Sequence, residues 1–210
     1  MYLSRYPTGN LGNYKSFGDT KFIPRISKDS FHSIVKATKN AASIETFSKI
    51  SEKIYSTTPA SSLLLGFPLE GHVSGYYSDN ISKADVEKVQ GILEKNGISA
   101  LNTRLFKNSN DGSYNVIIAS AKKEPSKTFQ VDNTTVIITY GDFENQMKSA
   151  AQNINEAVKY AANENESNMC LEYEKSFATG SIDSHRESQK WWIKDVGPVV
   201  ECNRMYEFSI

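Results

Sequence analysis

The residues best suited to chemistry are three histidines, His32, His72 and His185, each of which stands alone in the sequence. A zinc site would need three distant ligands to converge, and no ligand spacing in the sequence predicts this. The sequence has no Cys-x-x-Cys, His-Glu-x-x-His, phosphate-binding glycine loop or Gly-x-Ser-x-Gly elbow. We therefore predict no complete zinc site in this chain. We interpret His32 as a surface or half-buried histidine and His72 as structural, with a cleft-facing His72 as the alternative.

His185 lies among charged residues on a segment that we expect to be helical. Asp183 and Glu187, four residues apart, share one helix face, where like charges cost stability unless a cation neutralises them. Arg186 and Lys190 are the cations available nearby. Two interpretations stay open for this region: a buried ion-pair network, which we favour because such networks perturb acidic groups without doing chemistry, and a ligand site.

Two adjacent tryptophans, Trp191 and Trp192, follow on the same segment. Adjacent helical residues cannot face one direction, so we expect one ring in the core and the other half exposed. A tryptophan packed beneath a peptide-binding groove is the alternative.

Glu201 follows an apolar Pro-Val-Val stretch, which places a carboxylate at the end of a stiff segment. A charge-assisted hydrogen bond is stronger in a dry site than in water. Such a carboxylate suits the capture of a cationic group, for example the amino terminus of a peptide. An ordinary salt bridge is the alternative.

The elements that must position these residues begin with helices and continue with a sheet. Apolar spacings of three and four predict two helices within residues 29–54, and Ser82 with Asp85 predicts the capped start of a third. The strands expected from their composition are residues 72–78, 100–106, 114–120 and 134–141. An Asp-Gly turn joins the second to the third, so we expect a small antiparallel sheet.

Three more helices are expected after Asp142, and the last must end before Gly197-Pro198 because proline cannot continue a helix. The strands are not interleaved with crossover helices. This order predicts an α+β fold, a small antiparallel sheet packed with helices.

Composition excludes several classes of function. Lysine and arginine total 24, as do aspartate and glutamate, so no net field attracts nucleic acid or an anionic membrane. The two cysteines, Cys170 and Cys202, are far apart in sequence. No signal peptide is seen, and no apolar run approaches the roughly 20 residues of a membrane helix. We expect a cytoplasmic protein with free thiols and with neither nucleic-acid nor membrane partners.

Four stretches resemble successive segments of the dipeptidyl peptidase III family: "GNYKSFGDTKFIP", "ISALNTRLFK", "VKYAANENESNM" and "KSFATGSIDSHRESQKWWIKDVGPVVE". The resemblance implies a cytosolic zinc exopeptidase that removes dipeptides from the amino ends of short peptides, built as two lobes around a wide cleft. It also implies that Glu201 binds the free amino terminus of the substrate. The family's zinc motif, His-Glu-Leu-Leu-Gly-His with a distant glutamate, would fall beyond residue 210, so no catalytic or metal-binding residue is assigned here.

The resemblance stops at Cys202, where the family continues with Ile-Gly-Phe-Ile-Glu, and Asn203 stands where some members carry a substrate-contacting tyrosine. The amino terminus is also interior to the family's usual length. We expect a fragment that is inactive alone, part of the lobe without zinc, whose oligomeric state the sequence does not predict. The alternative is a genuine short product that binds peptides or partners without catalysis.

The expected organisation has three parts. Residues 1–141 form a helix-plus-sheet region, residues 142–201 a helical segment leading to the substrate cleft, and residues 202–210 a divergent tail.

Overall fold

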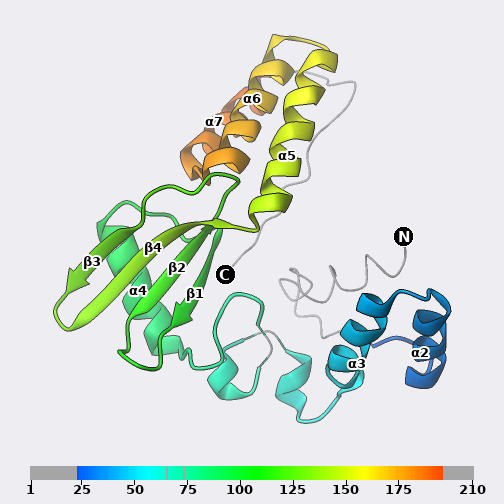
Figure 1. Ribbon diagram of the computed structural model, residues 1–210. Helices are drawn as coiled ribbons and strands as arrows, with labels where there is room; N and C mark the ends of the chain where they lie inside the picture. The colour runs from blue at the N-terminus through cyan, green and yellow to red at the C-terminus, as the bar shows by residue number, and fades with distance from the viewer. Residues whose placement is uncertain (1–22, 65, 73, 196–210) are drawn as a thin grey trace. The chain divides into compact units, whose positions relative to one another are not determined.

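The computed structural model describes residues 23–64, 66–72 and 74–195. The chain divides into two compact units between Gly75 and Tyr76, and Figure 1 shows the elements of each. The expected division at residues 141 and 142 falls inside the second unit, between a strand and a helix. Glu201, Gly197-Pro198 and the tail at 202–210 lie outside the described residues.

The first unit contains the two helices that apolar spacing predicted, α2 (Lys28–Ala37) and α3 (Ala41–Tyr55). Ser27 caps α2 by accepting from the Ser30 backbone N–H, and the Asn40 side chain caps α3 in the same way from Ser43. Such caps satisfy backbone donors that the first turn leaves without a helical partner. The two helices pack through a small core of Phe31, Val35 and Phe47.

The sequence predicted a strand at residues 72–78, and this prediction is wrong: the described residues of that stretch form no strand. Tyr77 forms only an isolated bridge to Leu105. The Leu105 backbone exchanges hydrogen bonds with Tyr76 and Ser78, at 2.8 and 3.1 Å between nitrogen and oxygen. The chain then turns, because the Ile81 N–H donates to the Ser78 carbonyl, and pairing cannot continue.

The second unit begins with α4 (Lys83–Lys95), which has the predicted capping box between Ser82 and Asp85. Its sheet has the order β1-β2-β4-β3, built from β1 (Thr103–Lys107), β2 (Tyr114–Ala119), β3 (Lys127–Val131) and β4 (Thr134–Asp142). The pairs β1–β2 and β3–β4 are antiparallel, and β2–β4 is parallel. The sheet is therefore mixed, where a wholly antiparallel one was expected. The difference comes from β3, which the sequence analysis did not predict: β4 forms an antiparallel pair with β3 and lies parallel to β2 on its other side.

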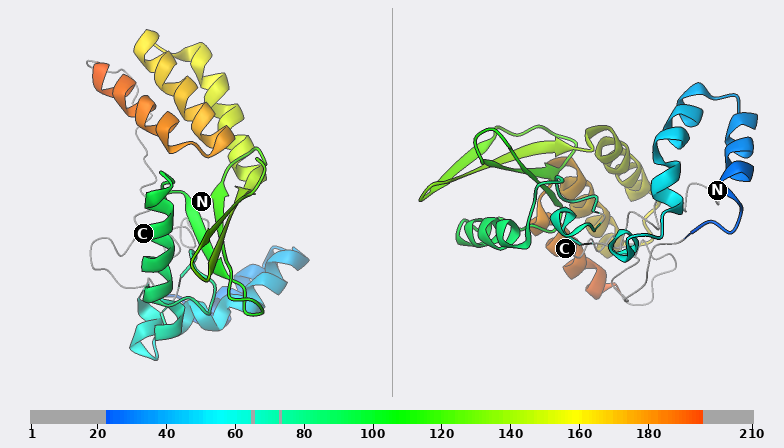
Figure 2. Two further views of the ribbon diagram at one scale, coloured as in Figure 1. Left: turned by 90° about the vertical axis from the view of Figure 1, so that its left-hand side faces the viewer. Right: turned by 90° about the horizontal axis from the view of Figure 1, so that it is seen from below.

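One face of this sheet packs against α4, which lies along it in Figure 2. Buried and half-buried side chains alternate along β2 and β4, as expected where one face is covered. Burying a side chain such as the fully covered Ile138 contributes about 1.5–3 kcal/mol. The core on this face consists of Ile81, Val89, Ile92, Leu93, Leu105, Tyr114, Val116, Ile118, Val136 and Ile138.

Three helices follow β4, as the sequence predicted: α5 (Glu144–Ala157), which continues into the short η3 (Val158–Tyr160), then α6 (Glu164–Thr179) and α7 (Ile182–Lys194). Helix α6 packs against both α5 and α7. Figure 1 shows this helical layer at one end of the sheet. Helices and a separate small sheet make an α+β fold, as expected. None of the described helices is long and apolar enough to cross a membrane.

Gly180, between α6 and α7, joins this layer to the sheet. It adopts φ +75°, and a Cβ there would lie 2.6 Å from Ile118 Cγ2 and 2.9 Å from the Ala119 carbonyl oxygen. The Asn102 side chain donates to the Gly180 carbonyl at 3.0 Å. Only glycine combines this backbone conformation with such a close approach.

Candidate functional site

His185 lies in the packing between α6 and α7. Its half-buried ring lies 5.8 Å from the ring of Tyr173, measured between centroids. The Tyr173 hydroxyl accepts a hydrogen bond from Gln189 Nε2 at 2.7 Å. Burial, and then the nearby charge of Arg186, lower the pKa of His185, which keeps it neutral at pH 7. His185 therefore serves helix packing in the described structure.

The charged residues around His185 form two separate surface pairs, and the favoured interpretation of a buried network is wrong. Arg186 Nη1 lies 3.0 Å from Asp183 Oδ1, and Lys190 Nζ lies 2.6 Å from Glu187 Oε1. The Asp183 side chain is 88% exposed. Spacings of three residues hold each pair on the outer face of α7, where an ion pair contributes at most about 1 kcal/mol.

Trp191 and Trp192 are both half buried against the cluster of Met169, Cys170 and Tyr173. The expectation of one core ring and one half-exposed ring is wrong because α7 rests mainly on α6 and is covered on one side. Lys194 Nζ lies 4.0 Å from the centroid of the Trp191 ring, a cation–π contact. Both rings thus belong to the helix interface.

The end of α7 is tied to the beginning of α6. Asn163 Oδ1 caps α6 by accepting from the Glu166 N–H at 2.9 Å, while Asn163 Nδ2 donates to Asp195 Oδ1 at 2.9 Å. Asn165 Nδ2 donates to the Lys194 carbonyl at 3.2 Å. The sequence shows a good helix cap at Asn163 but not its second partner, which lies 32 residues away. Glu201 follows Asp195 by six positions.

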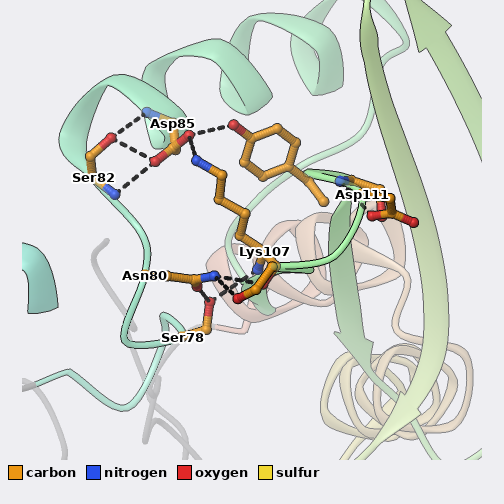
Figure 3. A network of polar contacts seen from close by, with 9 residues as sticks. Ser78, Asn80, Ser82, Asp85, Lys107 and Asp111 are labelled. Atoms are coloured by element: carbon orange, nitrogen blue, oxygen red, sulfur yellow. Dashed lines mark hydrogen bonds and ion pairs between the residues drawn. The ribbon is translucent and has the colours of Figure 1, made fainter.

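A polar network surrounds Asp85, as Figure 3 shows, and the sequence analysis did not predict it. Asp85 Oδ1 accepts from Lys107 Nζ at 2.8 Å and from the Tyr114 hydroxyl, and Oδ2 accepts from the Ser82 N–H and hydroxyl at 2.9 and 2.6 Å. Burial alone would raise the pKa of Asp85, but these hydrogen bonds outweigh it and hold the pKa well below its usual range. A buried carboxylate with four donors is a structural anchor, since no lone pair remains for a substrate.

The same network fixes the chain that leads into α4 (Figure 3). Asn80 Nδ2 donates to the Lys107 carbonyl at 3.0 Å, and the Lys107 N–H donates to Ser78 Oγ at 3.0 Å. These bonds join residues 78–82 to β1, so the capping box and the sheet edge hold each other in place.

A second ion pair lies at the junction of β4 and α5. Arg104 donates from Nε and Nη2 to the two oxygens of Asp142, both at 2.6 Å. The guanidinium carbon lies 5.2 Å from the ring centroid of Phe106 and 4.7 Å from that of Phe143. Phe143 has φ +52°, a conformation that costs about 1–3 kcal/mol outside glycine. The bidentate pair and the ring contact hold this turn in place.

The described residues do not fit the zinc site that the resemblance implies. His32 and His72 belong to the first unit and His185 to α7. Within residues 23–64, 66–72 and 74–195, no three His, Cys, Asp or Glu side chains gather so as to hold a metal ion.

Residues 46–206 match the sequence model of peptidase family M49. The chain belongs to this family. It is 46% identical over 197 residues to dipeptidyl peptidase 3 of Dictyostelium discoideum, covering 93% of this chain and 28% of that protein. Identity to the dipeptidyl peptidase 3 of Nematostella vectensis is 42% over 215 residues, covering 92% of this chain and 29% of that protein. Identity to the dipeptidyl peptidase 3 of Homo sapiens is 33% over 211 residues, covering 91% of this chain and 28% of that protein.

The chain therefore spans a little over a quarter of the length of these relatives. The stretch matched to family M49 contains the sheet, the helical layer and Glu201.

Proposed function

We propose that this chain is the part of an M49 zinc-dependent dipeptidyl peptidase that binds the amino terminus of a short peptide, and that Glu201 is the residue that binds it. The family match over residues 46–206 carries the proposal. The relatives named dipeptidyl peptidase 3 support the reaction, release of dipeptides, and the cytoplasm is the proposed location.

The proposed chemistry of Glu201 is electrostatic. A carboxylate held near the amino terminus of a peptide accepts charge-assisted hydrogen bonds from the ammonium group, which are roughly twice as strong as bonds between neutral groups. Such a group selects peptides whose amino terminus is free and fixes which peptide bond comes next to the catalytic groups. Zinc and the general base are proposed to come from parts of the longer relatives that this chain does not match.

Calorimetry with a tetrapeptide, either with a free amino terminus or acetylated, tests the role of Glu201. We expect the chain to bind the free peptide about 10- to 100-fold more tightly than the acetylated one, because a hydrogen bond to a charged group contributes that much to affinity. Glu201→Gln should lose this preference. Glu187→Gln is the matched control because Glu187 pairs with Lys190 on the surface of α7. The proposal would be contradicted if the unmodified chain, like Glu201→Gln, bound the free and the acetylated peptide with the same affinity.

The proposed inactivity of the chain alone is tested by its dipeptide release in the presence of zinc. We expect none from the purified 210-residue protein. Release with stoichiometric zinc would overturn this part of the proposal. Mass spectrometry of the endogenous protein around Glu201 separates a longer peptidase from a short peptide-binding product, because only the former continues past Ile210.

A further inference from the structure

Residues 122–128, which lead from β2 into β3 (Figure 1), are all exposed. The start of this segment is fixed to the end of α6, because the Lys122 N–H donates to the Ala178 carbonyl at 2.9 Å. Its end is fixed where β3 begins at Lys127. Between these points, the backbone of residues 123–126 makes no hydrogen bond to any part of the chain that the structure describes. The segment is therefore held at both ends and free between them.

Ser126 lies in this free stretch, and its hydroxyl has no hydrogen-bond partner among the described residues. Pro125 stands directly before it. A proline fixes its own φ near −65° and restricts the residue before it, here Glu124, to extended backbone. The sequence itself thus keeps the chain extended next to a free, exposed hydroxyl.

Lysines surround this hydroxyl in the sequence. Lys122 and Lys123 stand four and three positions before Ser126, and Lys127 follows it. Lys123 Nζ lies 2.8 Å from Glu144 Oε2, but both side chains are exposed, and such a surface pair opens at little cost. Protein kinases discriminate among acceptor hydroxyls partly by the charges beside them. An exposed serine that follows two lysines has the charge pattern of one class of kinase substrate.

We infer that Ser126 is a phosphorylation site for a serine/threonine kinase that recognises basic residues before its acceptor, with ATP as the phosphoryl donor. The Ser126 Oγ attacks the γ-phosphorus of ATP, the bond from that phosphorus to the β–γ bridging oxygen breaks, and ADP leaves. A carboxylate of the kinase accepts the hydroxyl proton. The phosphate carries a charge of about −1.5 to −2 at pH 7. It cancels most of the positive charge of residues 122–127, where three lysines stand against one glutamate.

Ser56 is the other described serine or threonine that has a lysine or arginine three positions earlier. That lysine, Lys53, lies in the last turn of α3. The Ser56 N–H donates to the Glu52 carbonyl at 2.8 Å, and its hydroxyl donates to the Thr58 carbonyl at 2.9 Å. A kinase binds Ser56 in an extended segment only after the end of α3 unwinds. Ser56 therefore matches Ser126 in sequence spacing and differs from it in structure.

Phosphorylation of the full 210-residue chain by the catalytic fragment of protein kinase C with Mg-ATP, followed by site-resolved mass spectrometry, tests the site. Peptides of residues 119–130 and 49–60 give the rate at each serine without the fold. Ser126 is expected to react in the chain within about threefold of its peptide rate. Ser56 should react at least about thirtyfold more slowly than in its peptide, because local unfolding must come first. The same retardation of both serines, or no reaction in the 119–130 peptide, would overturn the inference.

The double variant of Lys122→Gln with Lys123→Gln tests recognition by charge in the same assay. It is expected to lower the rate at Ser126 about tenfold, the effect of losing two surface ion pairs with the kinase. Lys83→Gln with Lys88→Gln is the matched control, because it removes the same charge from exposed positions of α4. Equal rates in the two double variants would refute the recognition by lysine. Phosphate that persists within residues 119–131 of Ser126→Ala would refute the assignment of the acceptor.

Discussion

Asp85→Asn is the sharpest test of how the second unit is held together. The substitution keeps the shape of the side chain but removes its charge and replaces one acceptor oxygen with a donor. Asp85 is 8% exposed and receives hydrogen bonds from Lys107, Tyr114 and Ser82. In the variant, the amide must turn its NH₂ group toward one set of these donors.

The expected cost follows from those contacts. Losing the charge-assisted bond from Lys107 costs about 1.5–3 kcal/mol, and disturbing the capping box costs about 0.5–1 kcal/mol. The Lys107 side chain is 30% exposed, so water replaces part of what it loses. We therefore expect unfolding free energy to fall by about 2–3 kcal/mol, and the melting temperature to fall by roughly 5–10 °C.

Urea unfolding followed by tryptophan fluorescence measures this change, since both tryptophans lie in the second unit. The lowered pKa of Asp85 means that its stabilisation is complete above the unfolded pKa of about 4 and is lost as pH falls toward the folded value. The variant should therefore lose less stability than the original chain between about pH 5 and pH 2.

Asp183→Asn is the matched control, because the same chemical change removes only an exposed pair with Arg186. It should alter stability by less than about 0.5 kcal/mol. If Asp85→Asn also stays within that range and shows an unaltered pH dependence, the network does not stabilise the fold and the reasoning is refuted.

Three further predictions concern other contacts. Gly180→Ala should lower the free energy of unfolding by about 2–4 kcal/mol, because Gly180 has a positive φ and a Cβ there would overlap with β2. Gly97 also has a positive φ but open space around it, so Gly97→Ala should lower it by about 1 kcal/mol. Equal losses in urea unfolding would contradict this. Arg104→Met should lower the free energy of unfolding by about 2–3 kcal/mol because it leaves the buried Asp142 carboxylate without its partner, and a loss below about 0.5 kcal/mol in urea unfolding would count against this. The lowered pKa of His185 predicts that stability falls as pH drops through about 6.5, and His185→Gln should remove that slope from a pH series of melting temperatures.

Local patterns in the sequence predicted the helices well. The spacing of Phe31, Val35 and Phe47 and the pairing of Ser82 with Asp85 involve residues on one helix or two adjoining ones, whose geometry is fixed by the helical repeat. Family M49 was also recognisable from quoted stretches of the chain. These features require no knowledge of distant contacts.

Features that depend on distant partners were missed. β3 has Phe129 and Val131 as its only apolar residues, and the Asp-Asn turn after it was the signal that could have revealed it. Tyr114 reaches Asp85 across 29 positions, which no local pattern encodes. Exposure was misjudged around Asp183 for the same reason, since the burial of a helix face depends on its neighbours. The role of Glu201 stays a prediction because that residue lies outside the described part of the chain.

The strand order β1-β2-β4-β3 has a consequence for how this sheet assembles. It consists of two hairpins, each closed by a short turn, that meet along the parallel pair β2–β4. The hairpins form from neighbours in sequence and so form quickly, whereas the seam between them closes a longer loop. Val116 and Ile138 are paired across that seam, so we expect the core between the sheet and α4 to be complete only once the two hairpins have paired.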